Sequence, residues 1–301
     1  MASAYYVALF ATLASLTVAH ASVIPLPDGY HRDPPRNNHL EWKNCSVENY
    51  PGRECTRFEV PLDWHKAAVG KASLAVIRYP AMKSPKLGTL FMNPGGPGGS
   101  GVDTVQSSFG DQLMQESGGQ YDLVSKWEFD HEARIKLTLT GIPGWDPRGV
   151  GKSTPHTRCF GTFEEQTAFW NGSFIQTGVE AKGEFTSQAD LDLFYGQVGE
   201  VDDLLTRFGK QCLEYNPNAL QYIGTAATVR DIVAIHDVIE GPGKAINYWG
   251  ISYGTLLGNT FVNMFPDRVG RVMLDGVVNP IYYTSRPSYQ VRHSAYTSDG
   301  R

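Results

Sequence analysis

The sequence has few of the features that assign a chain to the common binding classes. Its 26 Lys and Arg residues are scattered among 31 Asp and Glu, and the net charge is −5. Because no basic stripe is present, we discount nucleic acid as a partner. Beyond the N-terminal region, no run approaches the roughly 20 apolar residues that cross a membrane. With 41% hydrophobic and 19% charged residues, the chain has the composition of one large globular domain.

The N-terminus has the pattern of a secretory signal peptide over residues 1–21. An apolar run from Tyr6 to Val18 precedes Ala19-His20-Ala21, a small-x-small cleavage pattern. No Lys or Arg precedes the run, so a buried N-terminal helix is the alternative. We expect a secreted, extracellular protein. The sequons Asn44-Cys45-Ser46 and Asn171-Gly172-Ser173 fit this location, with Asn44 and Asn171 as glycosylation sites.

Cysteine is scarce, and the four cysteines lack the spacing of a metal site. No Cys-x-x-Cys motif or closely spaced His pair is present, so we expect neither a metal nor a cofactor. An even number of cysteines in a secreted chain favours disulfides, and four cysteines allow three pairings. We favour Cys45–Cys55 with Cys159–Cys212, because the first two bracket a short stretch rich in turn residues.

Hydrophobic periodicity predicts alternating strands and helices after an extended lead-in at residues 22–54. Strands are expected at 58–60, 73–77, 88–92, 121–124, 246–249 and 271–274, and helices at 187–214, 228–239 and 252–265. This alternation indicates an α/β fold with a mainly parallel sheet.

One motif places a serine where a strand gives way to a helix. In Gly250-Ile251-Ser252-Tyr253-Gly254 the serine follows an apolar strand and opens an apolar helix. A sharp turn at this junction, with glycines relieving the crowding, forms the nucleophile elbow of serine hydrolases. The motif alone is weak evidence, but its context is the one that the elbow requires. We therefore predict Ser252 to be a nucleophile, which needs a base to take its proton.

A glycine-rich loop follows the strand predicted at 88–92. It reads Asn93-Pro94-Gly95-Gly96-Pro97-Gly98-Gly99-Ser100-Gly101. Backbone N–H groups of Gly95 and Gly96, together with that of Tyr253, are predicted to form an oxyanion hole. A phosphate-binding loop is disfavoured because both the Gly-Lys-Ser/Thr ending and the Gly-x-Gly-x-x-Gly spacing are missing. A purely structural turn is the other alternative.

Several stretches together resemble one branch of the α/β-hydrolases. They are CTRFEVPLDW, LGTLFMNPGGPGGSGV, WDPRGVGKSTP, YIGTAATVRDI, INYWGISYGT and FPDRVGRVMLDGVVNP. The chain resembles the secreted tripeptidyl aminopeptidase / proline iminopeptidase-like enzymes, in a fungal-type version. The resemblance implies an α/β-hydrolase fold and cleavage of peptides near the free N-terminus through an acyl-enzyme on Ser252. Peptides or small esters are the expected substrates, since esterases share this fold.

The catalytic acid and histidine are not evident after the serine. In α/β-hydrolases the chain order is Ser, acid, His. Only His293 follows among histidines, in a polar tail, and Asp275 is the one acid at a strand end. Both are weak candidates, since the resemblance places the acid on a later strand. We expect the acid, the histidine, the last strands and the cap to lie beyond Arg301. A non-catalytic remnant of a hydrolase is the alternative.

These expectations divide the chain into parts. Residues 55–280 would be the N-terminal part of the hydrolase domain, and 281–301 the start of a cap or an aberrant tail. The segment 126–144 interrupts the expected strand with charged residues, including Lys126, Asp130 and Arg134. A retained intron in the gene is our hypothesis for this insertion, and a genuine surface insertion is the alternative.

Overall fold

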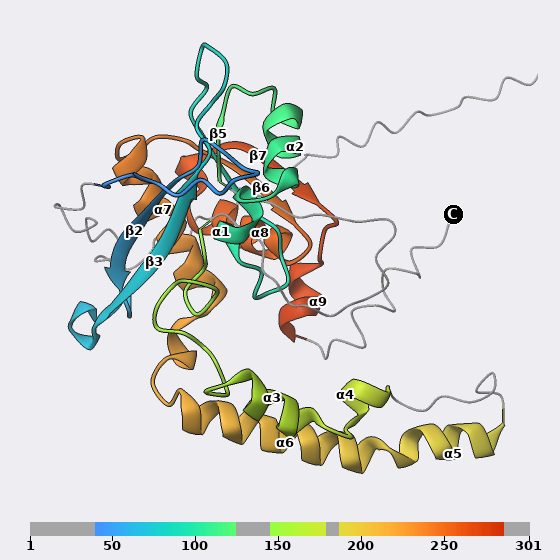
Figure 1. Ribbon diagram of the computed structural model, residues 1–301. Helices are drawn as coiled ribbons and strands as arrows, with labels where there is room; N and C mark the ends of the chain where they lie inside the picture. Colours follow the sequence, from blue (N-terminus) through green and yellow to red (C-terminus); the bar gives the residue numbers. More distant parts are fainter. Residues whose placement is uncertain (1–39, 125–144, 179–186, 286–301) are drawn as a thin grey trace, which may run out of the picture. The chain divides into compact units, whose positions relative to one another are not determined.

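The computed structural model describes residues 40–124, 145–178 and 187–285 (Figure 1). The expected signal peptide, the segment 126–144 and residues 286–301 lie outside the described residues. No described helix is both long enough and apolar enough to cross a membrane.

The strands form two sheets. Their bounds are β1 Lys43–Asn44, β2 Glu54–Pro61, β3 Lys71–Arg78, β4 Thr89–Asn93, β5 Asp122–Val124, β6 Ile246–Ile251 and β7 Val269–Asp275. The last four pair in parallel in the order β5-β4-β6-β7, which confirms the α/β expectation. The first three form a separate antiparallel sheet, β1-β2-β3. The connection between β2 and β3, residues 62–70, is shorter than the dozen or more residues that a parallel crossover requires. These two strands therefore pair antiparallel.

The helices only partly follow the sequence pattern. Their bounds are α1 Gly101–Val105, α2 Ser108–Glu116, α3 Phe163–Trp170, α4 Phe174–Thr177, α5 Gln188–Gly196, α6 Val198–Tyr215, α7 Thr225–Ile239, α8 Tyr253–Met264 and α9 Pro280–Ser285. The helices expected at 228–239 and 252–265 are confirmed as α7 and α8. The one expected at 187–214 is divided at Gln197 into α5 and α6. The short helices α1 to α4 and α9 were not predicted, because they are too short for a clear period.

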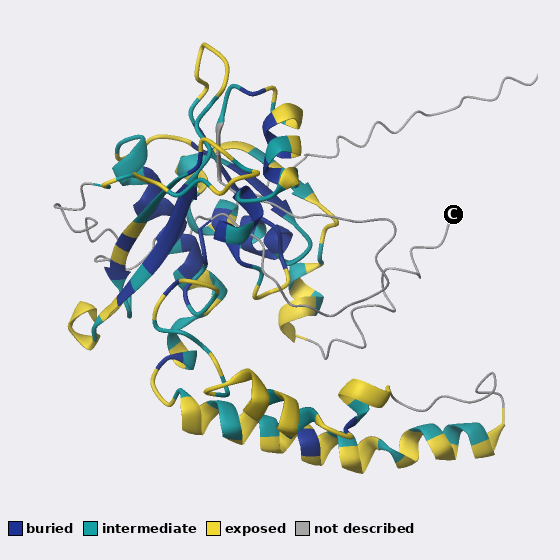
Figure 2. Cartoon of the chain, in the orientation of Figure 1, coloured by how far each residue is buried: buried dark blue, intermediate teal, exposed yellow. Residues whose placement is uncertain are grey.

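The main core lies where β4 and β6 pack against α7 and α8. It includes Phe91 of β4, Tyr248 of β6, Ile232 of α7 and Leu257 of α8, all fully buried. Figure 2 shows buried residues in these elements and in β2 and β3, whereas α5 and α6 are largely exposed. Leu204 is the one buried residue of α6.

The order of the parallel strands fixes where a ligand is expected. From β4 the chain moves to β5 on one side, and β6 and β7 lie on the other. Strand order therefore reverses between β4 and β6, and in open α/β sheets ligands bind outside the carboxyl ends of strands at such a point. The glycine-rich loop follows β4 there, and Ser252 follows β6.

Both expected disulfides are present. Cys45 pairs with Cys55, ten residues apart, and Cys159 pairs with Cys212, 53 residues apart. All four cysteines are used in this way, and none is free.

Candidate active site

Ser252 occupies a strained turn between β6 and α8. Its backbone has φ 54° and ψ −121°, and it is the one non-glycine residue with positive φ in the described part of the chain. Such strain costs about 1–3 kcal/mol and persists where surrounding contacts impose it. Here the Ser252 N–H donates to the carbonyl oxygen of Asp275 at 3.0 Å. Thr255 donates to the Ser252 carbonyl through both its N–H, at 2.9 Å, and its hydroxyl, at 2.6 Å.

The two glycines of the serine motif are required by close approach of the backbone. A Cβ on Gly250 would lie 2.2 Å from the carbonyl oxygen of Gly254. A Cβ on Gly254 would lie 2.3 Å from the carbonyl oxygen of Asn93, the last residue of β4. The elbow therefore packs against the end of β4 with no room for side chains.

The glycine-rich loop lies directly against Ser252. Gly95 has φ +100°, and a Cβ there would lie 2.6 Å from the Ile251 carbonyl oxygen and 2.9 Å from the Ser252 Cβ. Its N–H already donates to Asn93 Oδ1 at 3.0 Å. The contacts of Gly95 thus favour a steric role over the oxyanion-donor role expected from the sequence.

The N–H groups of Gly96 and Tyr253, the two other predicted donors, are not bonded to other described residues. Gly96 is exposed, and its N–H has no acceptor among the described residues. Tyr253 is the first residue of α8, so its N–H has no acceptor within the helix. These two groups can donate to an oxyanion, and the N-terminus of α8 adds a favourable dipole.

Of the two weak candidates for the catalytic acid and base, only Asp275 lies among the described residues. Asp275 ends β7 opposite Ile251, and its backbone contacts Ser252. Its side chain is exposed and forms no hydrogen bond or ion pair with another described residue. His293 lies outside the described residues. His236 is a core residue, 1% exposed, with its ring 6.0 Å from that of Phe91.

A buried carboxylate, Asp146, fixes the far end of the glycine-rich loop. Asp146 Oδ1 accepts hydrogen bonds from the Ser100 hydroxyl at 2.6 Å and from the Val102 N–H at 3.0 Å. Its other oxygen accepts from the Lys152 N–H. Burial raises the pKa of Asp146, and these hydrogen bonds oppose the rise. Asp146 thereby ties the loop to the turn at 147–154.

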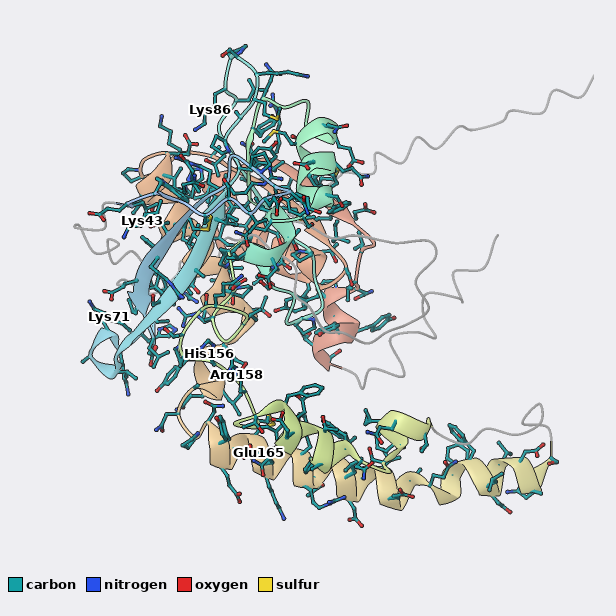
Figure 3. All side chains as sticks on the ribbon, in the orientation of Figure 1. Lys43, Lys71, Lys86, His156, Arg158 and Glu165 are labelled. Atoms are coloured by element: carbon teal, nitrogen blue, oxygen red, sulfur yellow. A yellow bond between two sulfur atoms is a disulfide. The ribbon has the colours of Figure 1, made fainter. Side chains whose placement is uncertain are left out.

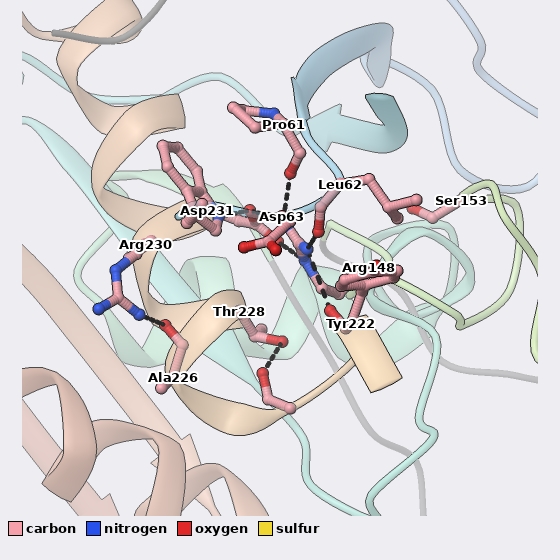
Figure 4. Close-up of polar contacts among 12 residues, drawn as sticks. Pro61, Leu62, Asp63, Arg148, Ser153, Tyr222, Ala226, Thr228, Arg230 and Asp231 are labelled. Carbon is pink, nitrogen blue, oxygen red and sulfur yellow. Dashed lines mark hydrogen bonds and ion pairs between the residues drawn. The ribbon is translucent and has the colours of Figure 1, made fainter. Parts of the chain in front are cut away.

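A fully buried ion pair holds that turn from the other side (Figure 4). The Arg148 guanidinium binds both carboxylate oxygens of Asp231 in α7, at 2.6 and 2.8 Å. Its remaining N–H groups donate to the carbonyl oxygens of Pro61, Leu62 and Tyr222. Burial raises the pKa of Asp231, and the Arg148 charge opposes that rise. The charge of Arg148 is fully used in this network.

Comparison with known proteins identifies the fold family. Residues 144–295 match the family described as the alpha/beta hydrolase fold, a stretch that holds both the serine elbow and the Asp146–Arg148 turn. The chain belongs to the alpha/beta hydrolase family.

Several curated proteins are similar to this alpha/beta hydrolase. It is 29% identical over 280 residues to the serine protease Hip1 of Mycobacterium tuberculosis, covering 90% of this chain and 46% of that protein. It is 29% identical over 248 residues to the tripeptidyl aminopeptidase of Streptomyces lividans, covering 80% of this chain and 38% of that protein. It is 30% identical over 197 residues to carboxylesterase B of M. tuberculosis, covering 64% of this chain and 31% of that protein. The chain thus spans about half the length, or less, of these relatives.

Sequence reasoning missed the supporting roles of Asp146 and Arg148. Both lie in WDPRGVGKSTP, which carried the family resemblance but had no role assigned to it. A Cβ on Gly151 would lie 2.4 Å from Asp146 Oδ2, so this motif also requires a glycine. An Asp and an Arg within three residues of the large apolar Trp145 were the signal that could have indicated a buried charged pair.

Proposed function

We propose that this alpha/beta hydrolase is a serine peptidase that cleaves peptides near the free N-terminus through an acyl-enzyme on Ser252. The observation that carries the proposal is the strained Ser252 elbow, held against the glycine-rich loop where the strand order of the sheet reverses. The names of Hip1 and the tripeptidyl aminopeptidase support a peptidase.

In the proposed reaction the Ser252 hydroxyl attacks a peptide carbonyl carbon while a base takes its proton. The resulting oxyanion accepts hydrogen bonds from the N–H groups of Gly96 and Tyr253. Losing one such donor costs about 2.7–4 kcal/mol of transition-state stabilisation. The base returns the proton to the leaving nitrogen as the tetrahedral intermediate expels the amine. The base then takes a proton from water, which attacks the acyl-enzyme, and the Ser252 hydroxyl is restored.

We assign the catalytic acid and histidine to sequence outside these 301 residues. His293 is the one histidine after Ser252, and the chain covers only 46% of Hip1 and 38% of the tripeptidyl aminopeptidase. On this proposal residues 55–280 are the N-terminal part of the hydrolase domain. The complete protein is then a longer peptidase of the fungal type that the sequence resembles. Asp275 and His293 are the alternatives within the chain.

A fluorophosphonate probe tests this assignment. In the purified 301-residue chain we expect slow labelling of Ser252, no faster than that of an unactivated serine, with Ser252→Ala as the control. Rapid labelling would overturn the assignment, and the variants Asp275→Asn and His293→Ala would then identify the groups responsible.

The processed transcript provides the complementary test. Sequencing from the codons of Tyr121 to well past Arg301 shows whether Lys126–Gly144 are retained and whether the frame continues. We expect a longer frame with a later Asp and His, whose product labels rapidly at Ser252. A longer product that is not labelled at Ser252 would refute the proposal of a serine hydrolase. A transcript that matches this chain would favour a non-catalytic protein.

An esterase is the second candidate function. The similarity to carboxylesterase B favours it, because that protein shares 30% identity with this chain. Comparing aminoacyl-amide and short-chain ester substrates on the longer product separates the two. Faster turnover of the esters, with no activity on aminoacyl amides, would replace the peptidase proposal.

We also propose secretion after cleavage of residues 1–21, with glycosylation. Asn44 in β1 and Asn171 at the end of α3 are both exposed, as an N-linked glycan requires. N-terminal sequencing of the protein from the culture medium should begin at Ser22. Glycosidase treatment should lower its mass, and the doubly substituted variant Asn44→Gln/Asn171→Gln should not change. Retention in the cell with an intact N-terminus would contradict this proposal.

A further inference from the structure

A cavity of about 230 Å³ lies beside the proposed oxyanion hole. Its walls come from the glycine-rich loop, the turn after Trp145, the region around the start of α7, and the first turns of α8. Gly95 and Tyr253 belong both to the cavity wall and to the immediate surroundings of Ser252. The cavity therefore lies close to where a substrate carbonyl would sit, at the carboxyl ends of β4 and β6.

The size of the cavity suits a single side chain. Pockets that enclose drug-sized ligands measure about 300–1,000 Å³, so this one is smaller than a complete ligand site. A water molecule takes about 30 Å³ in the liquid, so the cavity has room for one branched aliphatic or aromatic side chain.

Apolar side chains make up a large part of the cavity wall, beside backbone and a few polar side chains. Pro97, Pro147, Val150, Ile223 and Leu257 contribute aliphatic surface from four different segments. Burying an aliphatic side chain in such a place stabilises the complex, whereas burying an unpaired charge is strongly unfavourable.

The polar side chains of the wall already have partners. Arg148 is the one charged residue that lines the cavity among those described, and its guanidinium is fully bonded to Asp231 and three carbonyls. The hydroxyl of Thr157 donates to the Gly149 carbonyl at 2.6 Å. The hydroxyl of Tyr253 is 2.7 Å from that of Thr225. No charge is left to pair with a substrate carboxylate or ammonium.

We infer that this cavity binds an uncharged apolar side chain, that of the substrate residue whose carbonyl Ser252 attacks. The inference rests on the proposed function for the identity of that carbonyl. Tyr253 connects the cavity to the reacting carbonyl. Its N–H is a proposed donor to the oxyanion, and the same residue lines the cavity. A selected side chain, two bonds from the carbonyl, then helps to orient the carbonyl in the oxyanion hole.

The test measures binding rather than turnover, so that it does not depend on a catalytic base. The probes are the tripeptides Ala-Ala-Leu, Ala-Ala-Gly, Ala-Ala-Glu and Ala-Ala-Lys, titrated calorimetrically into the 301-residue chain. Since one methylene in an apolar pocket changes recognition by about 10–200-fold, we expect the Leu peptide to bind at least tenfold tighter than the Gly peptide. The Glu peptide is similar in size to the Leu peptide, so its weaker binding would report charge alone.

A matched pair of variants locates the effect. Val150→Trp fills the cavity and should abolish the preference for the Leu peptide. Val69→Trp makes the same change at a residue 44% exposed outside the cavity, and it should retain the preference. If Val150→Trp fails to fold in a thermal melt, Ile223→Trp fills the cavity from another segment of its wall.

Three results would overturn the inference: equal binding of the charged peptides, a preference that survives cavity filling, or no binding of any peptide. The proposed function fails separately. If the longer product is not labelled at Ser252 while the Leu preference persists, the peptidase proposal is lost and the apolar side-chain site remains. If labelling is rapid without any preference, only the side-chain site is lost.

Discussion

Replacing Arg148 with Met would leave a buried carboxylate without its cation. The side chains of Arg148 and Asp231 are 1% and 0% exposed. In the variant, Asp231 keeps the hydrogen bond from Trp64 Nε1 at 3.0 Å, but the carbonyls of Pro61, Leu62 and Tyr222 lose a donor. Removing one partner of a buried ion pair costs about 3–5 kcal/mol. For a domain of this size, 1 kcal/mol shifts Tm by about 2–4 °C, so we expect Tm to fall by about 6–20 °C.

Thermal melts followed by circular dichroism, without reductant, measure this change. The loss should be smaller at pH 5 than at pH 8, because the pKa of the unpaired Asp231 is raised in the folded state. A group of that kind contributes stability at low pH and loses it as pH rises through the folded pKa. The double variant Arg148→Met/Asp231→Leu removes both charges and should recover most of the loss.

The control is an exposed ion pair. Lys71 at the start of β3 pairs with Glu59 at 2.6 Å, and their side chains are 71% and 53% exposed (Figure 3). Lys71→Met should change stability by only about 0–1 kcal/mol. The reasoning is refuted if Arg148→Met costs no more than this control, or if the double variant is no more stable than the single one.

Three further predictions follow from the same contacts. Gly95→Ala should destabilise the protein more than Gly98→Ala, measured by urea unfolding, because both have positive φ but only Gly95 has neighbours within 4 Å; equal losses would contradict a clash with the elbow. Burial, then the Arg268 charge, lowers the pKa of His236, so stability is complete above the unfolded pKa of about 6.5 and is lost as pH falls through the folded pKa. His236→Gln should reduce the difference in Tm between pH 7.5 and 5.5, and an unchanged difference would exclude His236 as its source. Removing Cys159–Cys212 with two serines should cost about 1.5 kcal/mol more than removing Cys45–Cys55, since it closes a 53-residue rather than a ten-residue loop; equal costs by urea unfolding would contradict the chain-entropy argument.

The sequence alone determined the elements whose signals are local. The elbow at Ser252 follows from an apolar strand, a Gly-x-Ser-x-Gly turn and an apolar helix that are consecutive in the chain. The parallel sheet follows from alternating strands and helices. The division of the helix at Gln197 was not predicted, because the apolar period continues through the glycines on either side, Gly196 and Gly199.

Tertiary contacts decided which groups of the candidate site are free to act. Gly95 and Gly96 are equivalent in the sequence, but the amide of Asn93 takes the N–H of Gly95 and leaves that of Gly96 available. Arg148 lines the cavity, but its guanidinium is bound to the carboxylate of Asp231, 83 residues later in the chain, and is not free to bind a substrate anion. Local patterns fix the turn that carries a nucleophile, whereas donors and charges depend on partners brought together by folding, because a hydrogen bond or an ion pair is decided by distance in space and not by separation along the chain.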